Sequence, residues 1–151
     1  MTKPWSVTRI LCPTDFSAAS DAAIRAAEAI AQSFGARIDL VHVWLPPVAM
    51  AYDAAFIPTP DQIVGYTNDM QKNLAATAAR ISLPADRVDR HLIQGVPWQD
   101  VIATAVSKGC DLIVMSTHGR TGLTHFVMGS VAERVVRSSP VPVLVVPAPR
   151  P

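Results

Sequence analysis

Residues 116–130 combine glycines, hydroxyl side chains and an arginine in a way that suits the binding of an anion. The segment begins Ser-Thr-His-Gly-Arg-Thr-Gly and ends Met-Gly-Ser, where a helix is expected to start. Glycines let backbone N–H groups approach an anion closely because no Cβ intervenes, and a helix N-terminus adds N–H groups and a favourable dipole. Arg120 contributes a fixed positive charge and Ser130 a hydroxyl donor. We therefore expect this segment to suit a phosphate chain.

The same residues also have a structural interpretation that needs no ligand. Ser130 and Glu133 stand three positions apart before an apolar pair, which is the pattern of a capping box. Gly119 and Gly122 could simply form turns. The standard nucleotide motifs do not decide the question, because the chain contains neither G-x-x-x-x-G-K-[ST] nor G-x-G-x-x-G. From the residues alone, both interpretations remain open.

The elements that must position this segment follow from the periodicity of apolar residues. Strand-like runs cover residues 9–12, 37–43, 89–94, 112–115 and 141–146. Helical spacing between cap and stop residues covers 18–34, 60–83, 97–108 and 130–138. Apolar strands that alternate with helices are typical of a parallel sheet covered on both faces. The sequence therefore predicts an α/β fold, a doubly wound five-stranded parallel sheet with helices on both faces.

Two loops that follow expected strands are the candidate places for a ligand. In a doubly wound sheet, ligands bind beyond the carboxyl ends of the strands, where the strand order reverses. Residues 13–17, Pro-Thr-Asp-Phe-Ser, follow the first expected strand, and residues 116–122 follow the fourth. We expect the chemistry of the protein to lie in these two loops.

Length and composition limit the classes of protein to which the chain can belong. The 151 residues suffice for one domain, expected over 1–151, and 50% hydrophobic against 17% charged residues argues against a disordered chain. Thirteen Lys and Arg against twelve Asp and Glu leave a net charge of +1, which gives no reason to expect a nucleic-acid partner. The apolar stretch 40–52 is too short, and too broken by adjacent prolines, to span a bilayer. We expect a cytoplasmic protein without a membrane partner.

The cysteines and the strand histidines are interpreted as structural residues. Cys12 and Cys110 are too few for a disulfide scaffold and stand among apolar residues, so we expect buried, reduced thiols. His42 and His91 lie within expected strands, where a histidine usually serves packing and hydrogen bonding.

Three stretches of the chain resemble the universal stress protein family. They are Ile-Leu-Cys-Pro-Thr-Asp-Phe-Ser at 10–17, Met-Ser-Thr-His-Gly-Arg-Thr-Gly-Leu-Thr-His-Phe-Val-Met-Gly-Ser-Val-Ala-Glu-Arg-Val-Val-Arg at 115–137, and Pro-Val-Pro-Val-Leu-Val-Val at 140–146. In order and spacing, the match to the family extends over essentially the whole chain. The resemblance implies a Rossmann-like sheet with the strand order 3-2-1-4-5.

The ATP-binding members of this family carry G-x2-G-x9-G followed by Ser or Thr. Gly119, Gly129 and Ser130 fit this pattern, whereas Ser116 replaces the first glycine. We expect that a nucleotide can still approach the backbone closely if Ser116 has ordinary backbone angles. If that position needs a positive φ, we expect the affinity to drop.

The resemblance implies a site for ATP, or for AMP or ADP, together with Mg²⁺. Thr14 and Val43 would flank the adenine, and Asp15 would contact the ribose or the metal, since a bare carboxylate would repel phosphates. The alternative role of Asp15 is to cap the helix that follows. Met115 and Ser116 would lie beside the ribose. The residues expected at the nucleotide are Pro13, Thr14, Asp15, Val43, Met115, Ser116, Thr117, His118, Gly119, Arg120, Gly129, Ser130 and Val131.

The function implied by the resemblance is that of a homodimeric regulator or nucleotide sensor in stress response. The last strand, Val141–Val146, would pair across the dimer axis, and the protein partner is unidentified. A nucleotide-free dimeric interaction module of the same fold is the alternative, supported in sequence only by Ser116. A slow ATPase is a third hypothesis. The chain lacks a Ser-Gly-Gly loop after the first strand and a G-x-S-x-G elbow, which argues against a dedicated enzyme.

Overall fold

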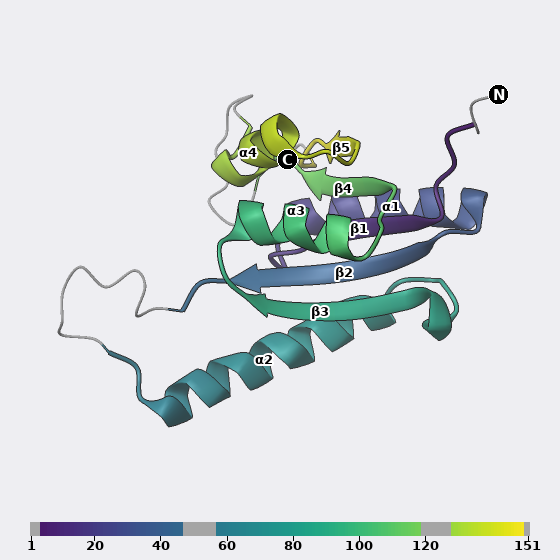
Figure 1. The fold of residues 1–151 in the computed structure, drawn as a ribbon. Helices are drawn as coiled ribbons and strands as arrows, with labels where there is room; N and C mark the ends of the chain where they lie inside the picture. The colour runs from purple at the N-terminus through teal and green to yellow at the C-terminus, as the bar shows by residue number, and fades with distance from the viewer. Residues whose placement is uncertain (1–3, 47–56, 119–127, 150–151) are drawn as a thin grey trace.

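The computed structural model describes residues 4–46, 57–118 and 128–149 (Figure 1). In these residues strands alternate with helices, as the apolar periodicity predicts. The elements in chain order are β1 (Arg9–Pro13), α1 (Ala18–Phe34), β2 (Arg37–Trp44), α2 (Pro60–Ala79), the 3-10 helix η2 (Ala85–Arg87), β3 (Val88–Gln94), α3 (Pro97–Ser107), β4 (Leu112–Ser116), α4 (Ser130–Ser138) and β5 (Val143–Val146). Among the helices of the described ranges, none has the length and apolar character needed to cross a membrane.

The strands form one parallel sheet in the order β3-β2-β1-β4-β5. Its register places Ile10 of β1 beside Ile38 of β2 on one side and beside Leu112 of β4 on the other. The strand order therefore reverses at β1, and the carboxyl ends of β1 and β4 are neighbours. This confirms the predicted doubly wound sheet and the order 3-2-1-4-5.

Alternate residues of the strands contribute to two cores, one on each face of the sheet. Ile10 and Cys12 pack with apolar side chains of α1 and α2, whereas Leu11 packs with side chains of α3 and α4. Figure 1 accordingly shows α1 behind the sheet and α3 in front of it. Burial raises the pKa of the Cys12 thiol to about 12 and that of Cys110 to about 11. Both cysteines are buried and free, as predicted.

Two element boundaries differ from the prediction by more than one residue. β5 begins at Val143 rather than at residue 141, because Pro142 has no N–H for the ladder. The carbonyl of Pro142 still accepts a hydrogen bond from the N–H of Ile113 at 2.9 Å. α2 ends at Ala79 rather than near residue 83, because the N–H groups of Arg80 and Ile81 bond the carbonyls of Thr77 and Ala78 in the tighter i to i−3 pattern.

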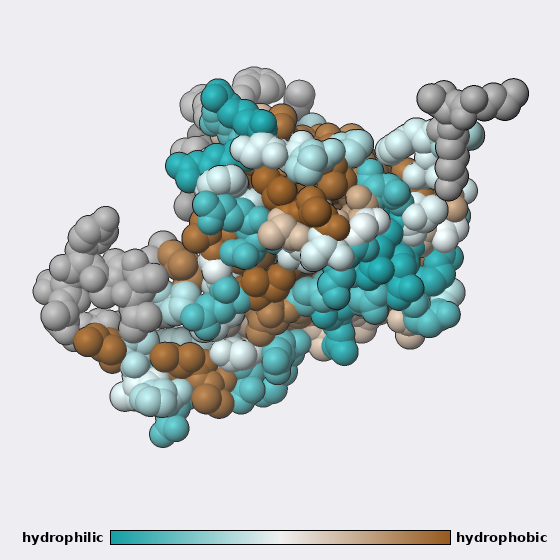
Figure 2. Space-filling model, in the orientation of Figure 1, coloured by the Kyte–Doolittle hydropathy of each residue, from teal (hydrophilic) through white to brown (hydrophobic). Residues whose placement is uncertain are grey.

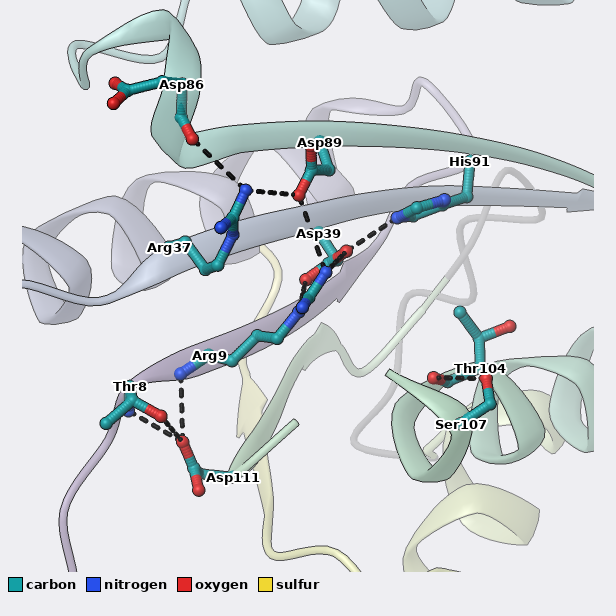
Figure 3. A network of polar contacts seen from close by, with 10 residues as sticks. All are labelled: Thr8, Arg9, Arg37, Asp39, Asp86, Asp89, His91, Thr104, Ser107 and Asp111. Carbon is teal, nitrogen blue, oxygen red and sulfur yellow. Dashed lines mark hydrogen bonds and ion pairs between the residues drawn. The ribbon is translucent and has the colours of Figure 1, made fainter. Parts of the chain in front are cut away.

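A network of charged residues crosses the sheet near the amino-terminal ends of β1, β2 and β3 (Figure 3). At its centre the fully buried Asp39 accepts two hydrogen bonds from Arg9, at 2.5 and 2.9 Å, and its Oδ1 lies 2.6 Å from Nε2 of His91. Arg37 and Asp89 form an ion pair at 2.7 Å beside it. Burial alone favours a raised pKa for Asp39. The hydrogen bonds from Arg9 and His91 outweigh burial and lower that pKa below its ordinary value. His91 is therefore a structural residue, as predicted.

Candidate functional site

A cavity of about 260 Å³ lies at the carboxyl edge of the sheet, where β1 and β4 diverge. The loop after β1, the end of β4 and the first turn of α4 form most of its wall. Its lining residues are Pro13, Thr14, Asp15, Ser20, Val41, His42, Val43, Pro97, Val101, Met115, Ser116, Thr117, His118, Gly129, Ser130, Val131 and Ala132. The cavity therefore occupies the position that the switch in strand order predicts for a ligand.

Eleven of the thirteen residues expected at the nucleotide line this one cavity. The other two, Gly119 and Arg120, lie outside the described residues. The lining residues that the sequence did not suggest include Ser20 and His42. Ser20 lies inside α1 and carried no motif that could have identified it. The position of His42 near the end of β2 was the available signal, since β2 ends at the same sheet edge.

Thr14 anchors the loop between β1 and α1. It is buried, its N–H donates to the carbonyl of Val41 at 2.9 Å, and its Oγ1 lies 3.1 Å from Oγ of Ser20. The same Oγ1 accepts the N–H of Phe16 at 3.0 Å. These contacts tie the loop both to the neighbouring strand and to α1, so the loop is preorganised.

Phe16 adopts φ 65, the left-handed region that non-glycine residues rarely enter. A bulky side chain in this region costs on the order of 1 kcal/mol or more, and such positions cluster at functional sites. The ring of Phe16 packs against that of His42, with centroids 4.5 Å apart. The strained turn at Phe16 directly follows Asp15, so it helps to direct the loop that carries this carboxylate.

The carboxylate of Asp15 lines the cavity and also supports the start of α1. Its Oδ1 accepts the N–H of Ser17 at 3.0 Å and the Ser17 hydroxyl at 2.5 Å. Ser17, not Asp15, is the N-cap, and its side chain accepts from the N–H of Ser20. Asp15 therefore orients the capping residue without itself capping the helix. This arrangement holds the carboxylate at the cavity wall.

His42 is held by the same loop. Its Nδ1 lies 2.7 Å from the carbonyl oxygen of Thr14. A carbonyl oxygen can only accept a hydrogen bond, so Nδ1 carries a proton. This hydrogen bond to the loop supports the interpretation of His42 as a structural residue. Its place in the cavity wall adds a second role that the strand position alone did not indicate.

On the opposite wall, α4 begins at the cavity without a side-chain cap. Gly129 is the N-cap, with φ −61 and ψ 154, and Ser130 is the first helical residue. The capping-box interpretation of Ser130 and Glu133 is therefore wrong, because the cap position belongs to a residue that has no side chain. The initial N–H groups of α4 receive no acceptor from a cap side chain, which is the arrangement that binds anions at helix N-termini.

Gly129 also fits closely against the end of β4. Its N–H donates to the carbonyl of Thr117 at 2.7 Å, and a Cβ at position 129 would lie 3.1 Å from that oxygen. Glycine thus lets the start of α4 approach the strand. Ser116, which replaces the first glycine of the motif, is the last residue of β4. In the described residues Phe16 is the only non-glycine with positive φ, so Ser116 fits with ordinary backbone angles.

The cavity carries little net charge of its own. Apart from its histidines, Asp15 is the one ionisable side chain among the described residues that line it. Across the described ranges, no group of three or more His, Cys, Asp or Glu residues could hold a metal ion.

A doubly wound parallel sheet with a cavity at its switch point defines an α/β protein of the class that binds small ligands at that edge. The family model for the universal stress protein family matches residues 6–147. The chain belongs to this family. Universal stress protein MJ0531 of Methanocaldococcus jannaschii is 31% identical over 144 residues, which cover 94% of this chain and 83% of the relative. A universal stress protein of Thermus aquaticus is 31% identical over 137 residues, covering 91% of this chain and 96% of the relative.

Solved structures show the same fold. The hypothetical protein MJ0577, also from Methanocaldococcus jannaschii, superposes with a TM-score of 0.67 at 24% identity, covering 96% of this chain and 99% of the other. A universal stress protein in complex with cAMP gives a TM-score of 0.63 at 21% identity, covering 95% of this chain and 99% of the other. A family member from Burkholderia pseudomallei gives a TM-score of 0.72 at 25% identity, covering 94% of this chain and 97% of the other.

Proposed function

We propose that this protein binds an adenine nucleotide in the cavity between β1 and β4 and acts in stress response as a homodimeric regulator or nucleotide sensor. The observation that carries the proposal is the start of α4 at Gly129. There, uncapped helix N–H groups lie in the wall of a cavity that also contains the Asp15 carboxylate. A helix N-terminus favours phosphate oxygens, and a carboxylate favours hydroxyl groups or a metal ion. A nucleotide offers all of these partners in one molecule.

The size of the cavity supports a small ligand. Ligand cavities typically measure about 300–1,000 Å³, and this one is near the lower end at about 260 Å³. A mononucleotide such as ATP, ADP or AMP suits it better than a polymer. One structural relative is a complex with cAMP, which is itself an adenine nucleotide.

The proposed contacts divide the cavity into regions. Thr14 and Val43 flank the adenine, while Met115, Ser116 and Asp15 lie near the ribose. Gly129, Ser130 and Val131 approach the phosphates, together with Gly119 and Arg120. Mg²⁺ is commonly held by one or two carboxylates plus substrate phosphates. Asp15 fits the carboxylate part of such a set, so the metal would enter with the nucleotide and offset the phosphate charge.

The proposed homodimer forms through Val141–Val146 at one edge of the sheet. The two edge strands differ in character: β3 carries Asp89, Arg90 and His91, whereas β5 reads Val-Leu-Val-Val. Charged residues protect an edge strand from pairing, and an apolar edge invites it. Leu144 of β5 is 40% exposed, and Figure 2 shows apolar surface between α3 and β5. A second copy of β5 would cover this edge.

Isothermal titration calorimetry with ATP and Mg²⁺ tests the binding. We expect saturable heat with one nucleotide per chain. The absence of heat at high micromolar nucleotide would instead support the nucleotide-free dimeric module. Rapid multiple turnover to ADP would instead point to a dedicated enzyme.

A further inference from the structure

The hydroxyl of Thr117 joins three parts of the structure at the cavity. Its Oγ1 accepts the N–H of Ala148, beyond β5, at 3.4 Å and lies 2.9 Å from Nδ1 of His118. The backbone of Thr117 is held separately. Its N–H donates to the carbonyl of Val146 at 3.1 Å, and its carbonyl accepts from Gly129 at 2.7 Å. The side chain of Thr117 can therefore be changed while its backbone contacts remain.

The proton of this hydroxyl can select the tautomer of the His118 ring. A threonine hydroxyl has one proton to donate, and the Ala148 N–H can only donate to it. Nδ1 of His118 lies 2.9 Å from this hydroxyl, so the hydroxyl can donate its proton to Nδ1 while its oxygen accepts from Ala148. When Nδ1 of a neutral imidazole accepts a hydrogen bond, the ring proton is on Nε2.

The other ring nitrogen of His118 lacks a partner. Nε2 is buried and has no hydrogen-bond partner in the part of the chain that the structure describes. A buried donor that makes no hydrogen bond is costly, and such groups in native proteins are few and call for an explanation. His118 lines the cavity together with Gly129 and Ser130, so a ligand oxygen at the start of α4 would supply the missing acceptor.

We propose that Thr117 is a positioning residue that sets the tautomer of His118, so that Nε2–H donates a hydrogen bond to a phosphate oxygen of the bound nucleotide. This inference rests on the proposed nucleotide site and extends it to two side chains whose roles the family motif does not define. It also gives the segment after β5 a link to the ligand, because Ala148 completes the hydrogen bonding of the Thr117 hydroxyl.

The tautomer can be measured without any nucleotide. Long-range ¹H–¹⁵N NMR of the free protein, at a pH where His118 is neutral, distinguishes a protonated Nε2 from a protonated Nδ1. We expect the Nε2–H tautomer in the wild type and in Thr117→Ser, and a loss of this preference in Thr117→Val. A wild-type Nδ1–H tautomer would overturn the proposal, whether or not ATP binds.

The second measurement is ATP affinity by calorimetry. Thr117→Ser keeps the hydroxyl and should stay within about twofold of the wild type, whereas Thr117→Val should bind roughly tenfold or more weakly, the usual range for a lost hydrogen bond to a charged group. The ATP affinity of His118→Ala should fall by a similar factor. The affinity of the double variant should be little lower than that of either single variant, because the two residues act as one unit. Equal affinities of the Ser and Val variants, or additive losses, would contradict the proposal. If the wild type binds no ATP, the phosphate role fails with the proposed function, while NMR still decides the tautomer.

Discussion

Replacing Gly129 by glutamate would place a carboxylate where the proposed phosphates lie. The backbone permits the change: φ is −61, an ordinary value for any residue, and the new Cβ would meet the carbonyl of Thr117 at 3.1 Å, which needs a shift of a few tenths of an ångström. The cost in folding should be small, on the order of 1 kcal/mol for a poorer N-cap. The new carboxylate and a phosphate about 4 Å away would repel each other by roughly 4 kcal/mol at an effective dielectric constant of 20. That energy corresponds to a Kd raised by about a factor of a thousand.

The assay compares ATP binding by calorimetry for the wild type, Gly129→Glu and a matched control, Gly65→Glu. Gly65 lies on α2 with open space around its Cβ position, so this control makes the same change of charge away from the cavity. We expect binding to be abolished in the first variant and retained in the second, with both variants showing a cooperative thermal transition. A folded Gly129→Glu protein that binds ATP with the wild-type Kd would refute the placement of the phosphates.

Three further predictions concern the fold and the dimer. Gly95→Ala should destabilise the protein by about 1–3 kcal/mol in urea unfolding, because its Cβ would lie 2.1 Å from the Asp100 carboxylate that accepts the Val96 N–H; an unchanged midpoint would contradict this. The pKa of Asp39 lies below its ordinary value, so its contribution to stability is present above that ordinary value and is lost as the pH falls through the folded-state pKa. The difference in unfolding free energy between wild type and Asp39→Asn should therefore shrink as the pH falls below the ordinary value of 3.8, whereas a constant difference would argue against the ion pair. Leu144→Lys should convert a dimer into a monomer in size-exclusion chromatography with light scattering, and a wild-type monomer at micromolar concentration would overturn the proposed pairing.

The fold could be predicted because the features that determine it are local. Apolar runs, caps and glycine stops alternate along the chain, and strands that alternate with helices leave a parallel sheet as the arrangement that buries them. The loops after β1 and β4 could be assigned to one site for the same reason, since parallel strands bring their carboxyl ends to one edge.

The features that escaped prediction depend on contacts between distant residues. Asp39 pairs with Arg9 and His91 only because three strands align in one register, which no local pattern specifies. The positive φ of Phe16 occurs in a loop that the hydrogen bonds of Thr14 hold in place, and phenylalanine has no intrinsic preference for it. The capping-box pattern at Ser130 was misleading because the helix begins one residue earlier than the pattern assumes, with Gly129 as its cap.

The central claim is that an adenine nucleotide lies with its phosphates at the start of α4. The most direct test is a crystal structure of the protein grown with ATP and Mg²⁺. We expect nucleotide density in the cavity between β1 and β4, with phosphate oxygens within hydrogen-bond distance of the N–H groups that follow Gly129. Nucleotide bound elsewhere on the molecule, or an empty cavity at saturating ATP, would contradict it.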